Sequence, residues 1–201
     1  MAGGNRDVFV NCPFDQKFKP LFHAIAFTVI RSGFRVRCAL EADDAAQNRF
    51  DKVCAIVREC QYGVHDISRT EVSGRPRLPR FNMPLELGVF LGATQYGGRE
   101  HKAKRCIIFD RAPYRFQSYI SDIAGQDIHS HDCDEATLIR ELAGWLRAQS
   151  HDPLVPGGNA ITREFRLFKE TLPAIGRARQ LGIGEMTFGD INDIMVQYVK
   201  S

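Results

Sequence analysis

The stretch Asp7-Val8-Phe9-Val10-Asn11 is a run of β-branched and aromatic residues that ends at Cys12-Pro13. A short apolar run bounded by a proline is typical of a buried strand that enters a loop. Apolar residues then recur at helical spacing between residues 18 and 32, and Gly33 stands where a helix commonly ends. Residues 34–40 predict a second strand. A strand, a helix and a second strand in this order indicate a parallel pair with a crossover helix.

The same alternation continues to residue 149. Strands are predicted at residues 62–67, 105–110 and 126–130, and helices at residues 50–60, 84–91, 114–123 and 135–149. Alternating strands and helices form parallel sheets that helices cover on both faces. Because crossovers are right-handed, such a sheet is doubly wound. We therefore expect an α/β fold with a flavodoxin-like, doubly wound parallel sheet of about five strands.

The composition and the pattern of the sequence change after Ser150. Residues 151–158 contain two prolines and two glycines and have the composition of a linker. Two helical patterns follow, at residues 160–181 and 188–199, and they are too short for an independent domain. We predict an α/β domain over residues 1–150 and a C-terminal helical appendage over residues 151–201, packed on the α/β body.

Composition excludes several classes of protein. Of 201 residues, 44% are hydrophobic and 25% are charged, which is ordinary globular usage, and the net charge of +3 is too small to indicate nucleic-acid binding. No apolar run approaches the roughly 18 residues of a membrane span, and the N-terminus lacks a secretory signal. The six cysteines form no C-x-x-C pair and mostly lie in apolar runs, which indicates reduced thiols. We expect a cytoplasmic protein that binds neither nucleic acid nor membranes.

Ligands of open parallel sheets bind beyond the carboxyl ends of the strands, near the point where the strand order reverses. The residues just past each predicted strand are therefore candidates for a site, although an aspartate at a strand end also favours a plain turn. Arginines near these loops are suited to hold phosphate groups, and an aromatic ring is suited to stack on a base. The predicted substrate-binding residues are Asn11, Pro13, Phe14, Asp66, Ser68, Asn82, Arg49 and Arg80.

Glu86 is the predicted catalytic residue. It interrupts a segment, residues 83–92, that is otherwise apolar or small and that we expect to be a helix buried nearly all round. Buried carboxylates are energetically expensive and tend to be kept for a task. Gly88 and Gly92 would let a ligand or another backbone approach this helix closely. In the alternative interpretation, Glu86 only complements the positive end of the helix dipole.

Two segments carry a resemblance to known families. Residues 7–11 resemble the first strand of TIR (Toll/interleukin-1 receptor) domains, and residues 82–92 resemble the Asn-x-x-x-Glu-Leu-Gly-x-x-x-Gly helix of bacterial TIR-like, nucleotide-binding effectors. The same helix, with Asp66 on the preceding strand, is also similar to nucleoside 2-deoxyribosyltransferases. The resemblance covers residues 7–150. The chain departs from both patterns, because Asn82 and Met83 replace the tryptophan-cysteine pair of many TIR domains and a basic stretch at residues 75–80 replaces the Gly/Ser-rich stretch of the transferases.

The resemblance implies a flavodoxin-like fold and a glutamate that acts on an N-glycosidic bond. As a TIR-like N-glycosidase, the protein would use Glu86 to cleave the nicotinamide–ribose bond of NAD or a related nucleotide. It would need no cofactor, and it would act as a homo-oligomer in bacterial defence or nucleotide signalling. If the protein is a transferase-like enzyme, Glu86 would attack C1′ of the sugar. Asp66 would then match an acidic binding residue of the transferases. A third hypothesis is a non-catalytic module that senses a nucleotide or assembles with partners.

Two other groups of residues suggest different chemistry. The pattern His129-x-His131-x-Cys133 has metal-ligand residue types but lacks a second ligand pair at zinc-site spacing, so we predict no metal site. Cys12 stands near a predicted helix start, where a thiol pKa is often lowered. Residues 13–15 are bulky and acidic rather than glycine-rich, which argues against a thiol enzyme with an anion-binding loop.

Overall fold

The computed structural model describes residues 5–41, 46, 48–70 and 80–201. The strands are β1 (Asp7–Asn11), β2 (Arg35–Arg37), β3 (Tyr62–Asp66), β4 (Arg105–Asp110) and β5 (Ile128–Ser130). The helices are α1 (Lys19–Arg31), α2 (Arg49–Glu59), α3 (Asn82–Tyr96), α4 (Glu135–Ser150), α5 (Gly158–Ala178) and α6 (Phe188–Lys200). Three 3₁₀ turns complete the set: η1 (Arg99–His101), η2 (Arg115–Ser118) and η3 (Ser121–Ile123).

The five strands form one parallel sheet in the order β2-β1-β3-β4-β5. This is the strand order of flavodoxin-like folds, and it reverses direction between β1 and β3. The predicted α/β fold is therefore confirmed. In the register of this sheet Asn11 lies opposite His65, so the carboxyl ends of β1 and β3 meet at one edge.

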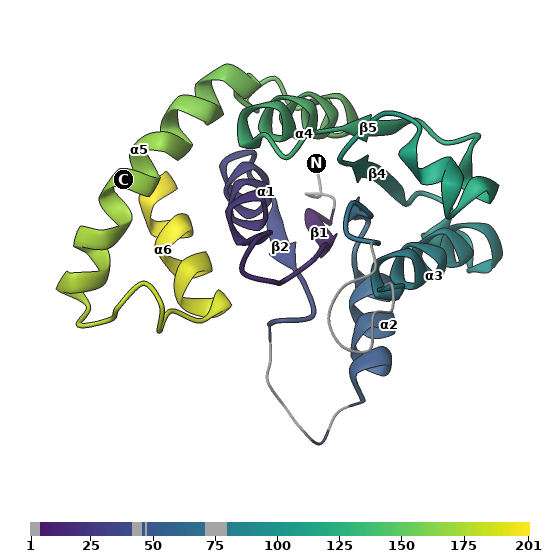
Figure 1. Cartoon of the computed structure of the whole chain (residues 1–201), viewed down its shortest axis with the longest axis horizontal. Helices are drawn as coiled ribbons and strands as arrows, with labels where there is room; N and C mark the ends of the chain where they lie inside the picture. Colours follow the sequence, from purple (N-terminus) through teal and green to yellow (C-terminus); the bar gives the residue numbers. More distant parts are fainter. Residues whose placement is uncertain (1–4, 42–45, 47, 71–79) are drawn as a thin grey trace.

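Helices cover both faces of the sheet (Figure 1). Side chains alternate along β1, since Val8 and Val10 pack in the same core as α1 and α4, whereas Phe9 packs with Val53 of α2 and Phe90 of α3. Because both faces of the sheet are buried, the strand sequences are nearly continuous apolar runs and do not alternate between apolar and polar residues.

The C-terminal helices share the core of the α/β body. The ring of Phe27, on α1, lies 5.3 Å from that of Phe165 and 5.2 Å from that of Phe168, both on α5. Tyr198 of α6 closes the same cluster, with its ring centroid 6.2 Å from that of Phe27. Helices α5 and α6 thus pack beside α1 and form an additional layer (Figure 1).

Two expectations about local structure are wrong. Residues 114–123 do not form an α-helix but the two 3₁₀ turns η2 and η3, which follow Tyr114 in a left-handed conformation with φ of 58°. The reason is a side-chain contact, because the Arg115 guanidinium donates to the buried carboxylate of Asp110 and to the carbonyl of Ser68. The second strand is also shorter than residues 34–40, since a turn begins at Leu40.

Helix α3 is not buried on all sides, contrary to expectation. Only one side packs against the sheet and its neighbours, and this side carries the buried residues Met83, Leu87 and Phe90. On the opposite side Leu85 is 56% exposed, and Phe81, just before the helix, is 58% exposed. The apolar composition of the helix therefore reflects an uncovered surface in addition to a core face.

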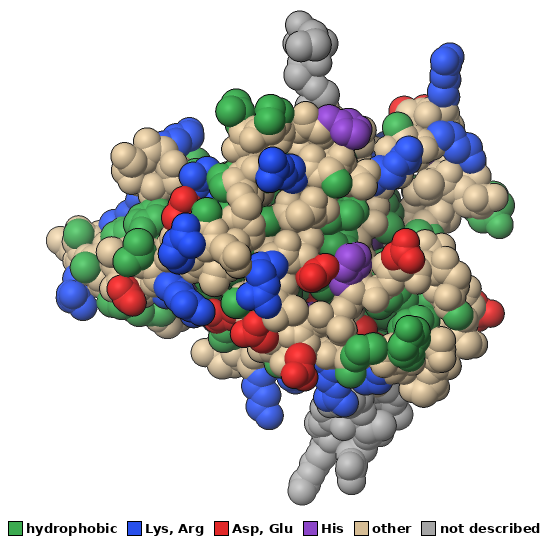
Figure 2. Space-filling view, turned by 90° about the horizontal axis from the view of Figure 1, so that it is seen from above, with side chains coloured by type: hydrophobic (Ala, Val, Ile, Leu, Met, Phe, Trp, Pro, Cys, Tyr) green, Lys and Arg blue, Asp and Glu red, His purple; other side chains and the backbone are tan. Residues whose placement is uncertain are grey.

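The surface carries mixed side chains. Figure 2 shows basic, acidic and apolar side chains interspersed on the face seen from above. All six cysteines are free thiols, and only Cys133 is exposed. In the described part of the chain, no helix combines the length and the apolar character that crossing a membrane requires.

Lys104 joins α2 to the start of β4. Its buried ammonium group donates to the carbonyl of Val57 at 2.6 Å and to that of Cys60, at the end of α2. The last carbonyls of a helix have no partner within the helix, and a cation at this end also favours the helix dipole. Lys104 thereby fixes the end of α2 against the sheet.

We expect Lys104→Met to lower the free energy of unfolding by about 1–3 kcal/mol, because it leaves buried carbonyls without a donor. Urea denaturation followed by circular dichroism measures the change. Lys102→Met, at an exposed lysine two residues earlier, is the matched control. Equal midpoints for the two variants would contradict the role assigned to Lys104.

Candidate functional site

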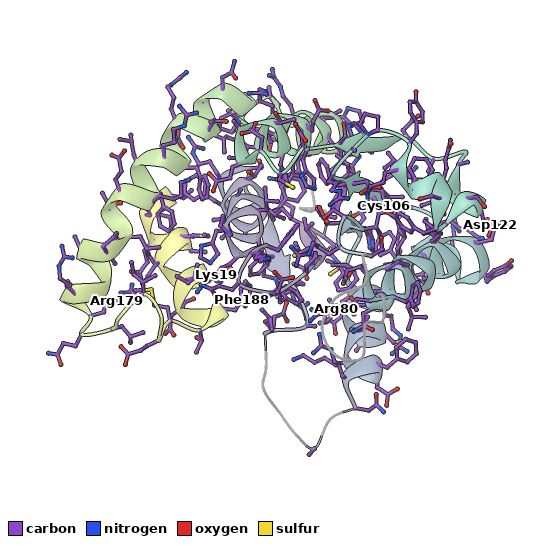
Figure 3. The ribbon with its side chains drawn as sticks, viewed as in Figure 1. Lys19, Arg80, Cys106, Asp122, Arg179 and Phe188 are labelled. Atoms are coloured by element: carbon purple, nitrogen blue, oxygen red, sulfur yellow. The ribbon has the colours of Figure 1, made fainter. Side chains whose placement is uncertain are left out.

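A cleft of about 290 Å³ lies at the carboxyl edge of the sheet, at the point between β1 and β3 where the strand order reverses. We call it the Glu86 cleft. Of the nine residues predicted for the site, seven line it: Asn11, Pro13, Phe14, Arg49, Arg80, Asn82 and Glu86. Cys12, Asp15, Arg69 and Met83 complete the lining. In Figure 3, Arg80 is labelled at this edge.

The end of β1 holds the first turn of α3 in place. The amide nitrogen of Asn11 donates to the carbonyl of Met83 at 2.9 Å and lies 3.1 Å from Nδ1 of His65. His65 is fully buried between the rings of Phe9 and Phe90, and this burial lowers its pKa to about 3. His65 is therefore neutral, and its Nδ1 accepts a hydrogen bond from the side-chain amide of Asn11. Asn11 thus fixes the helix that carries the catalytic candidate and also lines the cleft.

Glu86 is half-buried and projects from the first two turns of α3. It lies three residues after Met83 and four before Phe90, on the side of the helix that these buried residues share. No described residue donates a hydrogen bond to its carboxylate. Burial raises its pKa, and the positive charge of Arg49 opposes this shift in part. A poorly solvated carboxylate beside a cleft interacts strongly with positive charge that develops on a ligand.

Asp66 and Ser68 lie outside the Glu86 cleft. Asp66 is fully buried, and its Oδ1 accepts hydrogen bonds from the backbone N–H and the hydroxyl of Ser68 at 2.9 and 2.6 Å. Its Oδ2 accepts from Nε2 of the equally buried His131 at 2.9 Å. Because Nδ1 of His131 accepts the N–H of Cys133, Nε2 carries the proton of this ring. Asp66 is therefore engaged within the protein, and Ser68 lines a neighbouring cavity instead.

An ion pair forms the other wall of the Glu86 cleft. The guanidinium of Arg69 lies 3.3 Å from Oδ2 of Asp15. The Oδ1 of the same carboxylate accepts the backbone N–H groups of Lys17 and Phe18 at 3.0 and 3.2 Å. The loop after β1 is thus fixed to the loop after β3. Arg69 lines both the Glu86 cleft and the neighbouring cavity, so this pair stands between them.

The thiol of Cys12 is not suited to nucleophilic catalysis. Cys12 is buried, and this burial, together with the negative charges around it, raises the pKa of its thiol well above the usual value. A thiol in this environment stays protonated at neutral pH, whereas the nucleophile is the thiolate. The direction of this shift is the opposite of the lowered pKa that a position near a helix start favours.

The histidines of the His-x-His-x-Cys pattern have separate partners. His131 bonds to Asp66, whereas Nδ1 of His129 lies 2.9 Å from a carboxylate oxygen of Glu141. No group of three potential metal ligands occurs among the residues that the structure describes. Most of the basic stretch at residues 75–80 lies outside the described residues, which resume at Arg80.

Sequence reasoning did not place Met83 in the cleft or Asp66 outside it. Nothing in the sequence marks Met83 as a site residue, because its side chain is buried in the core. It reaches the lining of the cleft only because it lies on the first turn of α3. Asp66 could not be recognised as a buried hydrogen-bond acceptor, because its partner His131 is 65 residues away in the chain.

Glu86→Gln should make the folded protein more stable at neutral pH. The raised pKa means that the folded chain binds more protons than the unfolded chain as pH rises above the ordinary value of 4.5. The free energy of unfolding of the wild type therefore falls as pH rises through the interval between the two pKa values. The neutral amide avoids this penalty, so its advantage should be present at neutral pH and absent below pH 4.5. Thermal unfolding at both pH values, with the exposed Glu170→Gln as control, measures this difference.

Asp66→Asn should lower the free energy of unfolding by about 2–3 kcal/mol, because an amide NH₂ cannot accept the bonds that a buried carboxylate accepts. Asp122→Asn, at an exposed position, should have little effect in the same urea titration. If Asp66→Asn leaves stability unchanged but weakens ligand binding, then Asp66 acts as the ligand-binding residue predicted from the sequence.

No protein-family model matches this chain, and neither does any curated protein or solved structure. The similarity of residues 82–92 to a TIR-like helix remains a prediction from the sequence. The geometry of the Glu86 cleft and the chemistry of its side chains are therefore the basis for assigning a function.

Proposed function

We propose that this chain is an N-glycosidase that cleaves the nicotinamide–ribose bond of NAD or a related nucleotide, with Glu86 as the catalytic carboxylate. The main observation behind the proposal is the environment of the Glu86 carboxylate. Its carboxylate is half-buried in a cleft at the switch point of the sheet, its pKa is raised by burial, and no described residue satisfies it. Perturbed carboxylates in clefts are common at functional sites.

The chemistry needs little more than one well-placed carboxylate. When the bond between C1′ and the nicotinamide nitrogen breaks, its electron pair leaves with the ring, and the ring changes from a cation to a neutral molecule. The ribose becomes an oxocarbenium-like cation, which an adjacent carboxylate stabilises. Water then adds to C1′ and gives up a proton, which leaves a free ribose hydroxyl. Glu86 is the side chain of the cleft that suits this role.

The rest of the cleft suits a nucleotide. Arg49, Arg80 and Arg69 line it and offer guanidinium groups, which bind phosphate oxygens in bidentate fashion. The ring of Phe14 forms part of the wall, where a planar base could stack. Asn82, at the start of α3, offers an amide to ribose hydroxyls. These contacts would supply binding and positioning, which make up much of the catalysis when the leaving group is good.

A transferase-like activity, in which Glu86 attacks C1′ and forms a covalent intermediate, is the second candidate. Its family has an acidic binding residue at the position of Asp66, but here Asp66 is fully buried and bonded to Ser68 and His131. This favours hydrolysis over transfer. NAD is a substrate in the proposal, and no cofactor is required.

We include assembly of several copies in the proposal. The outer side of α3 carries Phe81, Leu85 and Tyr96 at helical spacing, with Gly88 and Gly92 between them, and these side chains are exposed. A Cβ added to either glycine would meet no described atom within 4 Å, so a partner could approach the helix closely. Exposed apolar surfaces of this kind often bind other proteins. The proposed setting is cytoplasmic, in bacterial defence or nucleotide signalling, and a non-catalytic assembly module is the remaining alternative.

Incubation of the purified protein with NAD, with nicotinamide followed by chromatography, tests the proposal. We expect nicotinamide release by the wild type and a loss of at least about 10²-fold in Glu86→Gln, because the carboxylate that stabilises the cation is gone. Activity of the wild type should fall as pH drops through the raised pKa of Glu86, since protonation removes the same charge.

Protein concentration is the second variable of this experiment. A specific activity that rises with protein concentration would support assembly, and a constant one would contradict it. Equal activity of the wild type and Glu86→Gln would overturn the catalytic role. Absence of release at every concentration would favour the non-catalytic module.

A further inference from the structure

A second, smaller cavity adjoins the Glu86 cleft. Its volume is about 200 Å³, and it lies between the start of α1 and the start of α6. Phe14 lines both cavities. Lys19 and Phe188, which line the second cavity, are labelled in Figure 3. We call this cavity the α6 slot.

The walls of the α6 slot are apolar and largely aromatic. The ring of Phe22 meets that of Phe14 edge-on at 5.1 Å and lies 5.5 Å from that of Phe188. Leu40 and Met186 complete the apolar lining. Small-molecule sites commonly combine such walls with a few polar groups.

The polar groups of the slot are few and suited to a neutral ring. Burial and the nearby Lys19 lower the pKa of His23 to about 4, so its imidazole is neutral at physiological pH and able to donate or accept a hydrogen bond. Gln16 offers an amide at the same cavity, and Lys19 offers the single positive charge among its lining residues. A planar heterocycle with hydrogen-bonding edges matches this set.

We propose that the α6 slot binds the purine base of a dinucleotide whose other glycosidic bond lies at Glu86. This inference rests on the proposed function and names the substrate class more closely, as a dinucleotide rather than a mononucleotide. The ligand would pass over Phe14, with its phosphates among the arginines of the Glu86 cleft. Helix α6, which neither related family explains, is then a substrate-binding element.

The volume of the α6 slot favours a single base over a whole nucleotide as its ligand. Sites for complete drug-sized ligands usually span about 300–1,000 Å³, and the slot is smaller than that range. A single aromatic base fits a volume of about 200 Å³. The Glu86 cleft, at about 290 Å³, remains for the reacting half of the ligand.

The larger cavity on the other side of the cleft is less suited to a base. Its volume is about 410 Å³, and four basic residues, Lys17, Arg69, Arg111 and Arg166, line it together with the acidic Asp134 and Glu135. Such a lining favours anionic groups rather than a neutral ring. The residue that this cavity shares with the Glu86 cleft, Arg69, is engaged in an ion pair with Asp15, whereas the residue that the slot shares with the cleft is Phe14.

The first test compares NAD with nicotinamide mononucleotide, which has the same scissile bond but no purine. Leu40→Trp fills the slot from a residue that is 41% exposed and thus spares the core, and Phe188→Ala removes one of its aromatic walls. In both variants we expect kcat/KM for NAD to fall about tenfold, the range that stacking of one base supplies, with kcat/KM for the mononucleotide unchanged. Tyr114→Ala, at an aromatic residue that is 74% exposed and lines neither cavity, is the matched control.

The second test does not depend on catalysis. Isothermal titration of adenosine 5′-monophosphate measures occupancy of the slot even if NAD is not cleaved, so failure of this inference and failure of the proposed function are distinguishable. We expect binding to the wild type and to Glu86→Gln, and weaker binding to Leu40→Trp and Phe188→Ala, with thermal unfolding confirming that both are folded. No binding to the wild type, or binding that only Arg166→Ala weakens, would overturn the inference.

Discussion

The buried carboxylate of Asp66 is the constraint on which the carboxyl edge of the sheet depends. It lies at the end of β3, the central strand, and its oxygens accept hydrogen bonds from Ser68 in the following loop and from His131 beyond β5. Removing a charge from water is costly unless its oxygens are hydrogen-bonded, so these two loops cannot separate cheaply. At the end of β4, Asp110 makes the same kind of connection through Arg115. The edge that carries the cleft is therefore held rigidly on its β3–β5 side.

The carboxylate of Glu86 differs from that of Asp66 in both burial and hydrogen bonding. Asp66 is fully buried and fully satisfied, whereas Glu86 is half-buried and no described residue donates a hydrogen bond to it. Helix α3 cannot turn away to hydrate this carboxylate, because the amide of Asn11 holds the carbonyl of Met83. Two acids near the same edge thus differ in how well their oxygens are satisfied, and the difference is set by their donors rather than by their depth alone. A carboxylate held in this way is ready for a cationic ligand without further rearrangement.

The sheet and much of the Glu86 cleft could be predicted from the sequence, because both follow from local patterns. Apolar periodicity fixes the strands and helices, and in a parallel sheet every strand ends at a predictable edge, which brought Phe14, Arg80 and Glu86 to one cleft. The 3₁₀ turns after β4 could not be predicted, because a long-range contact of Arg115 overrides local propensity. The exposure of one side of α3 could not be predicted from composition, because an apolar helix face has the same composition whether it is buried or exposed. The position of α6 beside Phe14 depends on how the C-terminal helices dock, which no local pattern encodes.

The shared aromatic cluster of α1, α5 and α6 has a consequence for synthesis on the ribosome. Phe27 is fully buried, and its neighbours Phe165, Phe168 and Tyr198 are translated well over a hundred residues later. While residues 1–150 emerge, α1 has no cover on this side, and a large apolar surface stays open to other nascent chains. Apolar surface that is exposed before folding is complete makes a chain prone to aggregation until the helices that cover it are made. Completion of the core is therefore postponed until α5 and α6 have been synthesised.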